Sequence, residues 1–173
     1  MHLITRLLWR IPKVDISRAC CSKSIRKLTT MAKTAINVAA AVLVHGKKVL
    51  LARRRGGYLD SLWEFPGGKL EKDESAGHAA HRELIEELDI RIVPEQTLLV
   101  LEHEYPDKTV RLHFVKCRLS DSPDQCLAKM TKNPEVSWFA PTDFPLGEFC
   151  PADRIAVGHL PWKQIITCED GNE

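Results

Sequence analysis

The 173-residue sequence has little of what marks several large classes of protein. No run of apolar residues approaches the roughly 18–20 that are needed to span a bilayer. Nine glycines and ten prolines are too few for a low-complexity chain, and six cysteines are too few for a disulfide scaffold. The cysteines form no Cys-x-x-Cys pair, which argues against a structural zinc site and favours a reducing compartment. What is left is a globular protein of about one domain, with 44% hydrophobic and 28% charged residues.

The net charge of +2 conceals an asymmetry along the chain. Residues 1–34 hold eight Lys or Arg and one Asp, which gives +7, whereas residues 35–173 hold seventeen Lys or Arg and twenty-two Asp or Glu, which gives −5. A mildly acidic body is a poor surface for the phosphate backbone of nucleic acids. We therefore expect no stable nucleic-acid binding. The sequence indicates no oligomeric state.

The N-terminal segment 1–34 is basic, rich in Ser and Thr, and begins with apolar residues at helical spacing. This composition is typical of a mitochondrial transit peptide, whereas Arg6 and Arg10 interrupt any secretory signal. A disordered extension, or an upstream start with translation beginning at Met31, fits the same residues. The expected location is thus the cytoplasm or the mitochondrial matrix, and not the secretory pathway.

The body of the chain, 35–168, is expected to form one α+β domain, followed by a short tail, 169–173. Period-two patterns and apolar runs between turn residues predict strands, and 3.6-residue periodicity predicts helices. We expect a helix over 73–88 capped by Asp73, and a second over 152–159 with Pro151 in its first turn. The expected strands are 35–44, 49–53, 98–102, 110–119 and 136–139.

Three glutamates crowd one face of the first helix. Glu83 precedes Glu86 by three residues and Glu87 by four, so their side chains are neighbours. Each like-charge pair at this spacing destabilises an isolated helix by about 0.2–0.5 kcal/mol. A divalent cation with hard oxygen ligands, Mg²⁺ or Mn²⁺, would offset the repulsion. A solvated acidic face paired with Arg82 is the alternative.

The wider spacing around these glutamates is more specific. Eight residues match the pattern Gly-x5-Glu-x7-Arg-Glu-U-x-Glu-Glu-x-Gly-U, where U is aliphatic: Gly68, Glu74, Arg82, Glu83, Leu84, Glu86, Glu87 and Ile90. Asp89 stands where this pattern has its second Gly, and we expect Asp89 to end the helix in a left-handed conformation. The pattern is the Nudix box, and residues 35–168 resemble the Nudix hydrolases. Segments 51–55, 63–71 and 149–153 are most similar to the MutT-type nucleoside triphosphate pyrophosphohydrolases.

The resemblance implies an α/β/α sandwich around a mixed β-sheet, with the box forming a loop, a helix and a loop. It implies that Glu83, Glu86 and Glu87 bind Mg²⁺ or Mn²⁺, with the carbonyl of Gly67 as a further ligand. The bound ion would activate a water. Glu83, or a further glutamate outside the box, would accept its proton. The family also uses a glutamate shortly before a late Trp as an extra metal ligand; here the nearest acid before Trp138 is Glu135, which does not fall at the usual offset.

By the same resemblance, the remaining box residues Gly68, Glu74 and Arg82 support the geometry of the box, the last two as an ion pair. Arg54 and Lys69 are candidates for phosphate binding, although Arg54 is equally well explained as a solvated arginine at a strand end.

At the base end, Asp153 stands where the family contacts the nucleobase, and a helix N-terminal Asp favoured by the dipole is the alternative. Phe65 and Phe114 could line the base pocket, but isolated aromatics usually belong to a core.

The implied activity is Mg²⁺-dependent hydrolysis of a nucleoside triphosphate to the monophosphate and pyrophosphate. Removal of oxidised nucleotides such as 8-oxo-dGTP from the DNA precursor pool is the leading interpretation. A pyrimidine pyrophosphohydrolase acting on CTP or dCTP is the close alternative, because a carboxylate at 153 also suits an exocyclic amine of cytosine. A non-catalytic Nudix-fold module that binds nucleotides is the alternative from another class.

Overall fold

The computed structural model describes residues 34–120, 133 and 135–167. The expectations for the basic N-terminal segment (residues 1–33) and for the tail 169–173 lie outside the described residues. No helix within the described part is both long enough and apolar enough to cross a membrane.

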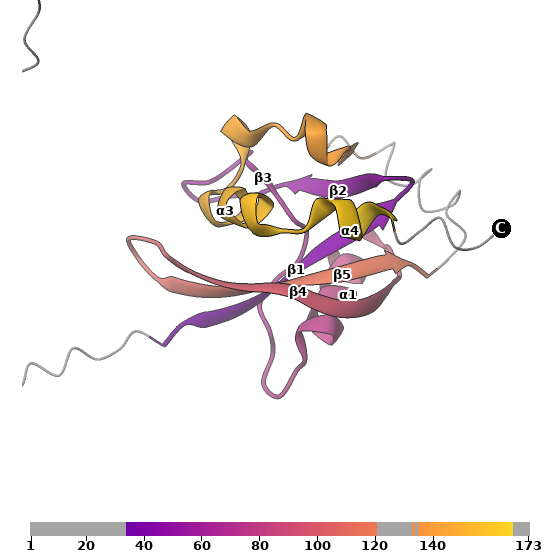
Figure 1. Ribbon diagram of the computed structural model, residues 1–173. Helices are drawn as coiled ribbons and strands as arrows, with labels where there is room; N and C mark the ends of the chain where they lie inside the picture. The colour runs from indigo at the N-terminus through magenta and orange to yellow at the C-terminus, as the bar shows by residue number, and fades with distance from the viewer. Residues whose placement is uncertain (1–33, 121–132, 134, 168–173) are drawn as a thin grey trace, which may run out of the picture. The chain divides into compact units, whose positions relative to one another are not determined.

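A mixed six-stranded sheet forms the centre of the domain (Figure 1). Its strands run in the order β3-β2-β1-β5-β4, and β6, which lies off this path, also pairs with β2. β1 and β5 are parallel, while the other pairings are antiparallel. The strands are β1 Ile36–His45, β2 Lys48–Arg53, β3 Trp63–Glu64, β4 Ile92–Glu104, β5 Thr109–Leu119 and β6 Val136–Phe139.

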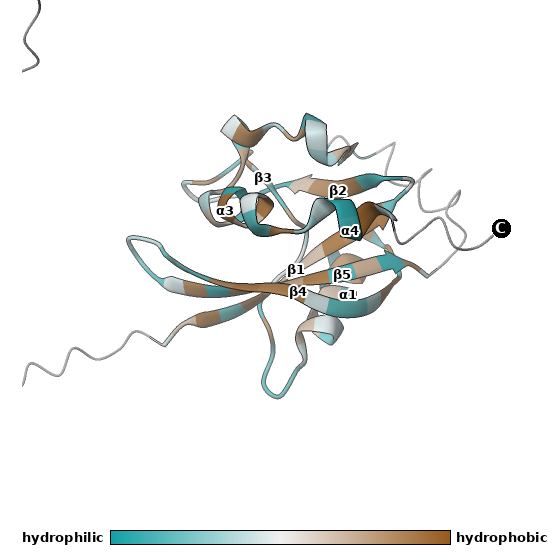
Figure 2. Ribbon diagram, in the orientation of Figure 1, coloured by the Kyte–Doolittle hydropathy of each residue, from teal (hydrophilic) through white to brown (hydrophobic). Residues whose placement is uncertain are grey.

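Helices cover both faces of the sheet, which confirms the expected sandwich. α1, Ala76–Leu88, packs on one face, and α3, Pro151–His159, with α4, Trp162–Thr167, lies on the other (Figure 1). Alternate residues of β1 serve the two cores: Ala40, Val42 and Val44 join the α3 and α4 side, and Ala39, Ala41 and Leu43 join the α1 side. The strands are accordingly apolar where helices cover them (Figure 2). Two short 3-10 helices, Pro141–Asp143 and Leu146–Glu148, precede α3.

The expected N-cap of α1 is wrong, whereas its expected left-handed C-terminal residue is confirmed. Ser75, and not Asp73, caps the helix, because its hydroxyl accepts a hydrogen bond from the backbone N–H of His78 at 3.2 Å. Asp73 instead lies in the preceding turn with φ 62°. At the other end Asp89 adopts the expected left-handed conformation, φ 54° and ψ 41°, and its N–H binds the carbonyl of Ile85.

The loop before α1, around residues 66–68, is joined to the edge of β1 by backbone hydrogen bonds. The N–H groups of Ala39 and Ala41 donate to the carbonyls of Gly68 and Pro66, each at 2.8 Å. Gly67, between the two acceptors, has φ 151°, and a Cβ there would collide with the carbonyl oxygen of Ala39. Glycine at 67 is therefore a requirement of the close approach of two backbones.

β4 begins at Ile92 rather than at 98, with irregular register near Pro94 and again near Leu99. Neither β3 nor α4 was expected. β3 consists of only two residues, and α4 follows Pro161, a residue type favoured at a helix start.

We predict opposite effects for two glycine substitutions. Gly67→Ala should lower the free energy of unfolding by about 2–4 kcal/mol, because the new Cβ meets backbone at a positive φ. Gly158→Ala, in the exposed part of α3 where a Cβ meets nothing within 4 Å, should raise it by about 0.5–1 kcal/mol. Urea unfolding of the two variants and the wild type measures both. Equal effects would contradict the backbone-collision argument.

Candidate active site

A cavity of about 750 Å³ lies beside the loop that is hydrogen-bonded to β1. This volume lies within the range of sites for small-molecule ligands. Side chains from several parts of the chain converge on it, among them the end of β2, β3, the box loop, the last turn of α1 and the start of α3. Its wall includes Arg54, Glu64, Lys69, Glu86, Glu87 and Asp153.

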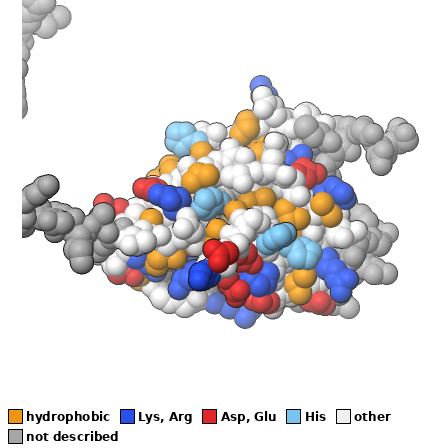
Figure 3. Space-filling view, turned by 90° about the horizontal axis from the view of Figure 1, so that it is seen from below, with side chains coloured by type: hydrophobic (Ala, Val, Ile, Leu, Met, Phe, Trp, Pro, Cys, Tyr) orange, Lys and Arg blue, Asp and Glu red, His pale blue; other side chains and the backbone are white. Residues whose placement is uncertain are grey.

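The carboxylates of α1 occupy one end of the cavity. Glu86 and Glu87 line it, while Glu83 lies one turn earlier with its carboxylate against Gly68. A Cβ at position 68 would collide with that carboxylate, so the glycine makes room for Glu83. Acidic side chains gather with Lys and Arg on the face that carries α1 (Figure 3).

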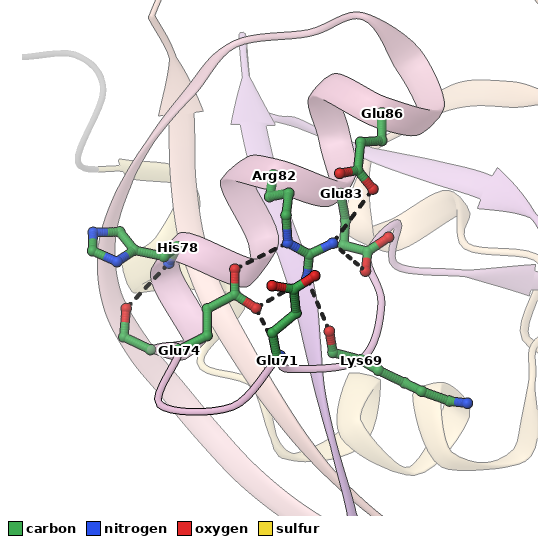
Figure 4. Close-up of polar contacts among 8 residues, drawn as sticks. Lys69, Glu71, Glu74, His78, Arg82, Glu83 and Glu86 are labelled. Atoms are coloured by element: carbon green, nitrogen blue, oxygen red, sulfur yellow. Dashed lines mark hydrogen bonds and ion pairs between the residues drawn. The ribbon is translucent and has the colours of Figure 1, made fainter.

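Arg82 connects the box loop to the helix (Figure 4). Its guanidinium donates two hydrogen bonds to the carboxylate of Glu74, at 2.9 and 3.0 Å, and one to the carbonyl of Lys69 at 3.0 Å. It also donates to Glu83 at 3.0 Å and to Glu86 at 3.4 Å. These bonds raise the pKa of Arg82 and lower that of Glu74, so both groups stay charged. The side chain of Lys69 points away from this cluster (Figure 4).

Glu87 is the α1 carboxylate whose titration is most perturbed. Burial, followed by the charges of Glu83 and Glu64, raises the pKa of Glu87 to about 7. Arg55 and Arg54 oppose this rise. Glu87 is an exposed residue, but the charges of Glu83 and Glu64 act on it, and a bound cation would relieve this repulsion. Clustered oxygen donors at one end of a polar cavity therefore fit Mg²⁺ or Mn²⁺.

Asp153 lies at another part of the cavity wall, in the first turn of α3. It is only 3% exposed, and its carboxylate accepts a hydrogen bond from the backbone N–H of Phe65 at 3.2 Å. Burial, then the charge of Glu64, raises the pKa of Asp153 to about 8. At neutral pH the side chain is therefore mainly protonated and can both donate and accept a hydrogen bond.

The two phenylalanines considered for the base pocket separate. Phe65 lines the cavity, and its ring stacks on Trp162 with centroids 6.2 Å apart. Phe114 is fully buried beneath Phe65, at 5.6 Å between centroids, and belongs to the core. Tyr105, which sequence reasoning missed, also lines the cavity, and burial followed by the charge of Asp153 raises its pKa to about 12.

Arg54, one of the candidates for phosphate binding, lies in the cavity wall and is paired with a glutamate. Its guanidinium lies 2.6 Å from the carboxylate of Glu64, which also accepts a weak hydrogen bond from the Cys150 thiol at 3.7 Å. Glu64, Cys150 and Asp153 have ligand atoms within 4.8 Å of one another. This trio suits a metal poorly, because the Arg54 cation already neutralises Glu64 and burial raises the pKa of both the thiol and Asp153. A charged residue in a short strand beside Trp63 was the available signal for Glu64.

Glu135, the candidate for an extra metal ligand whose offset from Trp138 is unusual, also lies in the cavity wall. Its backbone carbonyl accepts a hydrogen bond from the N–H of Arg53 at 2.7 Å, which fixes the chain at this point against the end of β2. The structure thus brings a fourth glutamate to the cavity that holds Glu86 and Glu87.

We predict a pH-dependent gain in stability for Glu87→Gln in the presence of a chelator. Below about pH 4.5 the carboxyl is protonated in both folded and unfolded chains and has no differential effect. As the pH rises to about 7, the unfolded chain ionises first, which destabilises the folded state. After a discount for its partial exposure, the variant should be more stable than wild type by about 1 kcal/mol at pH 8.

The same variant should be as stable as wild type at pH 4. Excess Mg²⁺ should shrink or reverse the difference at pH 8, because the ion stabilises the protein that binds it more tightly. Thermal unfolding with chelator and with Mg²⁺ measures both effects. A variant less stable than wild type at pH 8 with chelator would contradict the repulsion argument.

Comparisons with known proteins agree with this geometry. The NUDIX domain family matches residues 34–160. The chain is 39% identical over 128 residues to the CTP pyrophosphohydrolase of Escherichia coli K12, an alignment that covers 70% of this chain and 95% of that protein. It is 42% identical over 72 residues to the 8-oxo-dGTP diphosphatase of Buchnera aphidicola, which covers 42% of this chain and only 56% of that relative.

Solved structures give the same result. The MutT protein of methicillin-resistant Staphylococcus aureus 252 superposes with a TM-score of 0.56 at 33% identity, covering 78% of this chain and 98% of that one. The matched family spans both the glutamates of α1 and Asp153. The chain therefore belongs to the Nudix family of hydrolases.

Proposed function

We propose that this protein is a Mg²⁺-dependent nucleoside triphosphate pyrophosphohydrolase that releases a nucleoside monophosphate and pyrophosphate. One observation carries the proposal. A single cavity has clustered carboxylates at the last turn of α1 and a buried, protonated Asp153 in its wall. The first suits the metal ions that accompany a polyphosphate, and the second suits the uncharged edge of a nucleobase.

The metal end is assigned to Glu83, Glu86 and Glu87, with the carbonyl of Gly67 as a further ligand. A bound Mg²⁺ supplies charge neutralisation for the phosphates and lowers the pKa of the attacking water. Arg82 holds Glu83 and Glu86 in place through direct hydrogen bonds.

The proton of the attacking water needs a carboxylate acceptor. Glu83 is the first candidate, and Glu135 is the second because it lies in the same cavity wall. Either carboxylate must be ionised before the water is deprotonated, so activity should be lost at acid pH.

The base end is assigned to Asp153, with Phe65 and Tyr105 beside it in the cavity wall. A protonated carboxyl presents one donor and one acceptor, the pair that an oxidised guanine also presents on its edges. Relatives carrying the name 8-oxo-dGTP diphosphatase support removal of 8-oxo-dGTP from the nucleotide pool as the leading role.

A pyrimidine triphosphate is the second candidate substrate. It is favoured by the CTP pyrophosphohydrolase of Escherichia coli, the relative that is aligned over the greatest share of this chain among those compared above. An ionised Asp153 would accept the exocyclic amine of cytosine. A non-catalytic nucleotide-binding module is disfavoured, because clustered metal carboxylates have no use in it.

The deciding experiment is pyrophosphate release from a panel of nucleotides with Mg²⁺: 8-oxo-dGTP, dGTP, CTP and 5-methyl-dCTP. We expect the highest kcat/KM on 8-oxo-dGTP and no turnover with chelator. A preference for CTP or 5-methyl-dCTP would establish the pyrimidine alternative. Binding without turnover of any nucleotide would establish the non-catalytic one.

We predict that Glu87→Gln lowers kcat on the preferred nucleotide by at least about 100-fold, because a metal ligand and its charge are lost. Glu104→Gln is the matched control, since Glu104 is exposed at the end of β4 and outside the cavity wall. It should change kcat less than about twofold. Pyrophosphate release at saturating substrate and Mg²⁺ measures both. Near-wild-type turnover by Glu87→Gln would contradict the assignment of Glu87 as a metal ligand.

We predict that Asp153→Asn keeps turnover at pH 7 within about tenfold, because the amide also offers one donor and one acceptor. Wild-type kcat/KM on 8-oxo-dGTP should fall as the pH passes about 8, where Asp153 loses its proton, and that fall should be absent in the variant. Asp153→Ala should lose base discrimination by about 10–100-fold. An unchanged ranking of the four nucleotides in Asp153→Ala would refute the role of this carboxyl.

A further inference from the structure

Three consecutive arginines end β2 and enter the loop that follows it, and the first two are held by the protein itself. Arg53 donates to the carbonyl of Ser61 at 2.6 Å, pairs with Glu148 at 2.9 Å, and lies over the ring of Trp63 at 3.9 Å. Arg54 is paired with Glu64 at 2.6 Å. Both guanidiniums therefore stabilise the protein around the cavity, and neither is free to bind a ligand without breaking these contacts.

Arg55 differs from its neighbours in position. Its side chain lines the same cavity as Glu86 and Glu87. Within the part of the chain that the structure describes, it donates no hydrogen bond and forms no ion pair within 4 Å. Arg55 therefore shares the cavity wall with two carboxylates, and no ion pair among the described residues would have to be broken before it binds a ligand.

We propose that Arg55 binds the γ-phosphate of a nucleoside triphosphate and makes the enzyme prefer triphosphates to diphosphates. This inference rests on the proposed function and assigns a residue to its substrate class. Guanidinium matches phosphate oxygens with two parallel hydrogen bonds, and such charge-assisted pairs are stronger than neutral ones. Arg55 lines the same cavity as Glu86 and Glu87, so the phosphate farthest from the base would meet it.

The other cations in the cavity wall fit this role less well. Lys69 is exposed, and its side chain points away from the Arg82 cluster (Figure 4). Lys108 lies 3.6 Å from Asp107, so its charge is partly balanced. Arg55 is also exposed, lies in the cavity wall and has no ion-pair partner among the described residues.

The competing explanation is that Arg55 only moderates the charge of Glu87. In that case its loss would weaken metal binding and would slow all substrates alike. Terminal-phosphate binding instead predicts a loss confined to substrates that carry the third phosphate. Comparing a triphosphate with the diphosphate of the same base therefore separates the two roles.

The experiment compares Arg55→Gln, Arg55→Lys and Arg91→Gln with wild type on dGTP and dGDP at saturating Mg²⁺. Arg91 is an exposed arginine outside the cavity wall and serves as the matched control. Arg55→Gln should lower kcat/KM on dGTP by about 10–100-fold and on dGDP by less than about threefold. Arg55→Lys should recover part of the loss, and Arg91→Gln should match wild type. Equal losses on both substrates, or no loss on dGTP, would overturn the proposal.

A binding measurement separates this inference from the proposed function. Calorimetry with inorganic pyrophosphate and Mg²⁺ should show affinity weakened by about tenfold or more in Arg55→Gln, with dGMP affinity unchanged. This result can be obtained even if the wild type hydrolyses no nucleotide, an outcome that would defeat the proposed function alone. Unchanged pyrophosphate affinity in the variant, or none in the wild type, would defeat the role of Arg55. Matching thermal melting curves exclude misfolding as the cause.

Discussion

The arrangement of the cavity depends on the hydrogen bonds of one guanidinium. Arg82 joins Glu74 and the carbonyl of Lys69, on the loop, to Glu83 and Glu86, on the helix. Without a cation at this position, three glutamates near the C-terminal end of α1 would repel one another and the helix dipole. Arg82 offsets the negative charges of Glu83 and Glu86 through hydrogen bonds, but it forms no hydrogen bond with Glu87 among the described contacts. The helix is thus stable enough to form and still presents a carboxylate whose ionisation the fold disfavours.

A second ion pair, Arg54–Glu64, affects the protonation of the other carboxyl groups in the cavity. Arg54 and Glu64 lie beside Asp153, and the negative charge of Glu64 helps to keep that carboxyl protonated. The same negative charge also raises the pKa of Glu87. Glu64 therefore favours a neutral Asp153, which can donate and accept a hydrogen bond, at the proposed base end. At the proposed phosphate end, the same charge makes Glu87 an anion that a cation would stabilise. A nucleotide has the same two kinds of group, an uncharged base and a charged tail.

The sequence could predict what depends on local spacing. The helix with its three glutamates and the first two strands follow from periodicity and turn residues, while the left-handed Asp89 and the sandwich follow from the box and the resemblance it carries. What the sequence missed depends on partners distant in sequence. Glu64 and Arg54 meet because β2 and β3 are paired. Ser75 displaced Asp73 as cap because the backbone turns at Asp73 with positive φ, a choice that local composition leaves open.

The two regions of the cavity wall differ in how they are built, and this difference explains which part can vary. The proposed metal end is tightly packed: Gly67 lies against the carbonyl of Ala39, and Gly68 lies against the carboxylate of Glu83, so that added atoms collide. The proposed base end is lined by the side chains of Asp153 and Tyr105. A family built in this way keeps its phosphate chemistry while its base preference changes. Relatives named for 8-oxo-dGTP and for CTP, at similar identity to this chain, are what such a division of roles would produce.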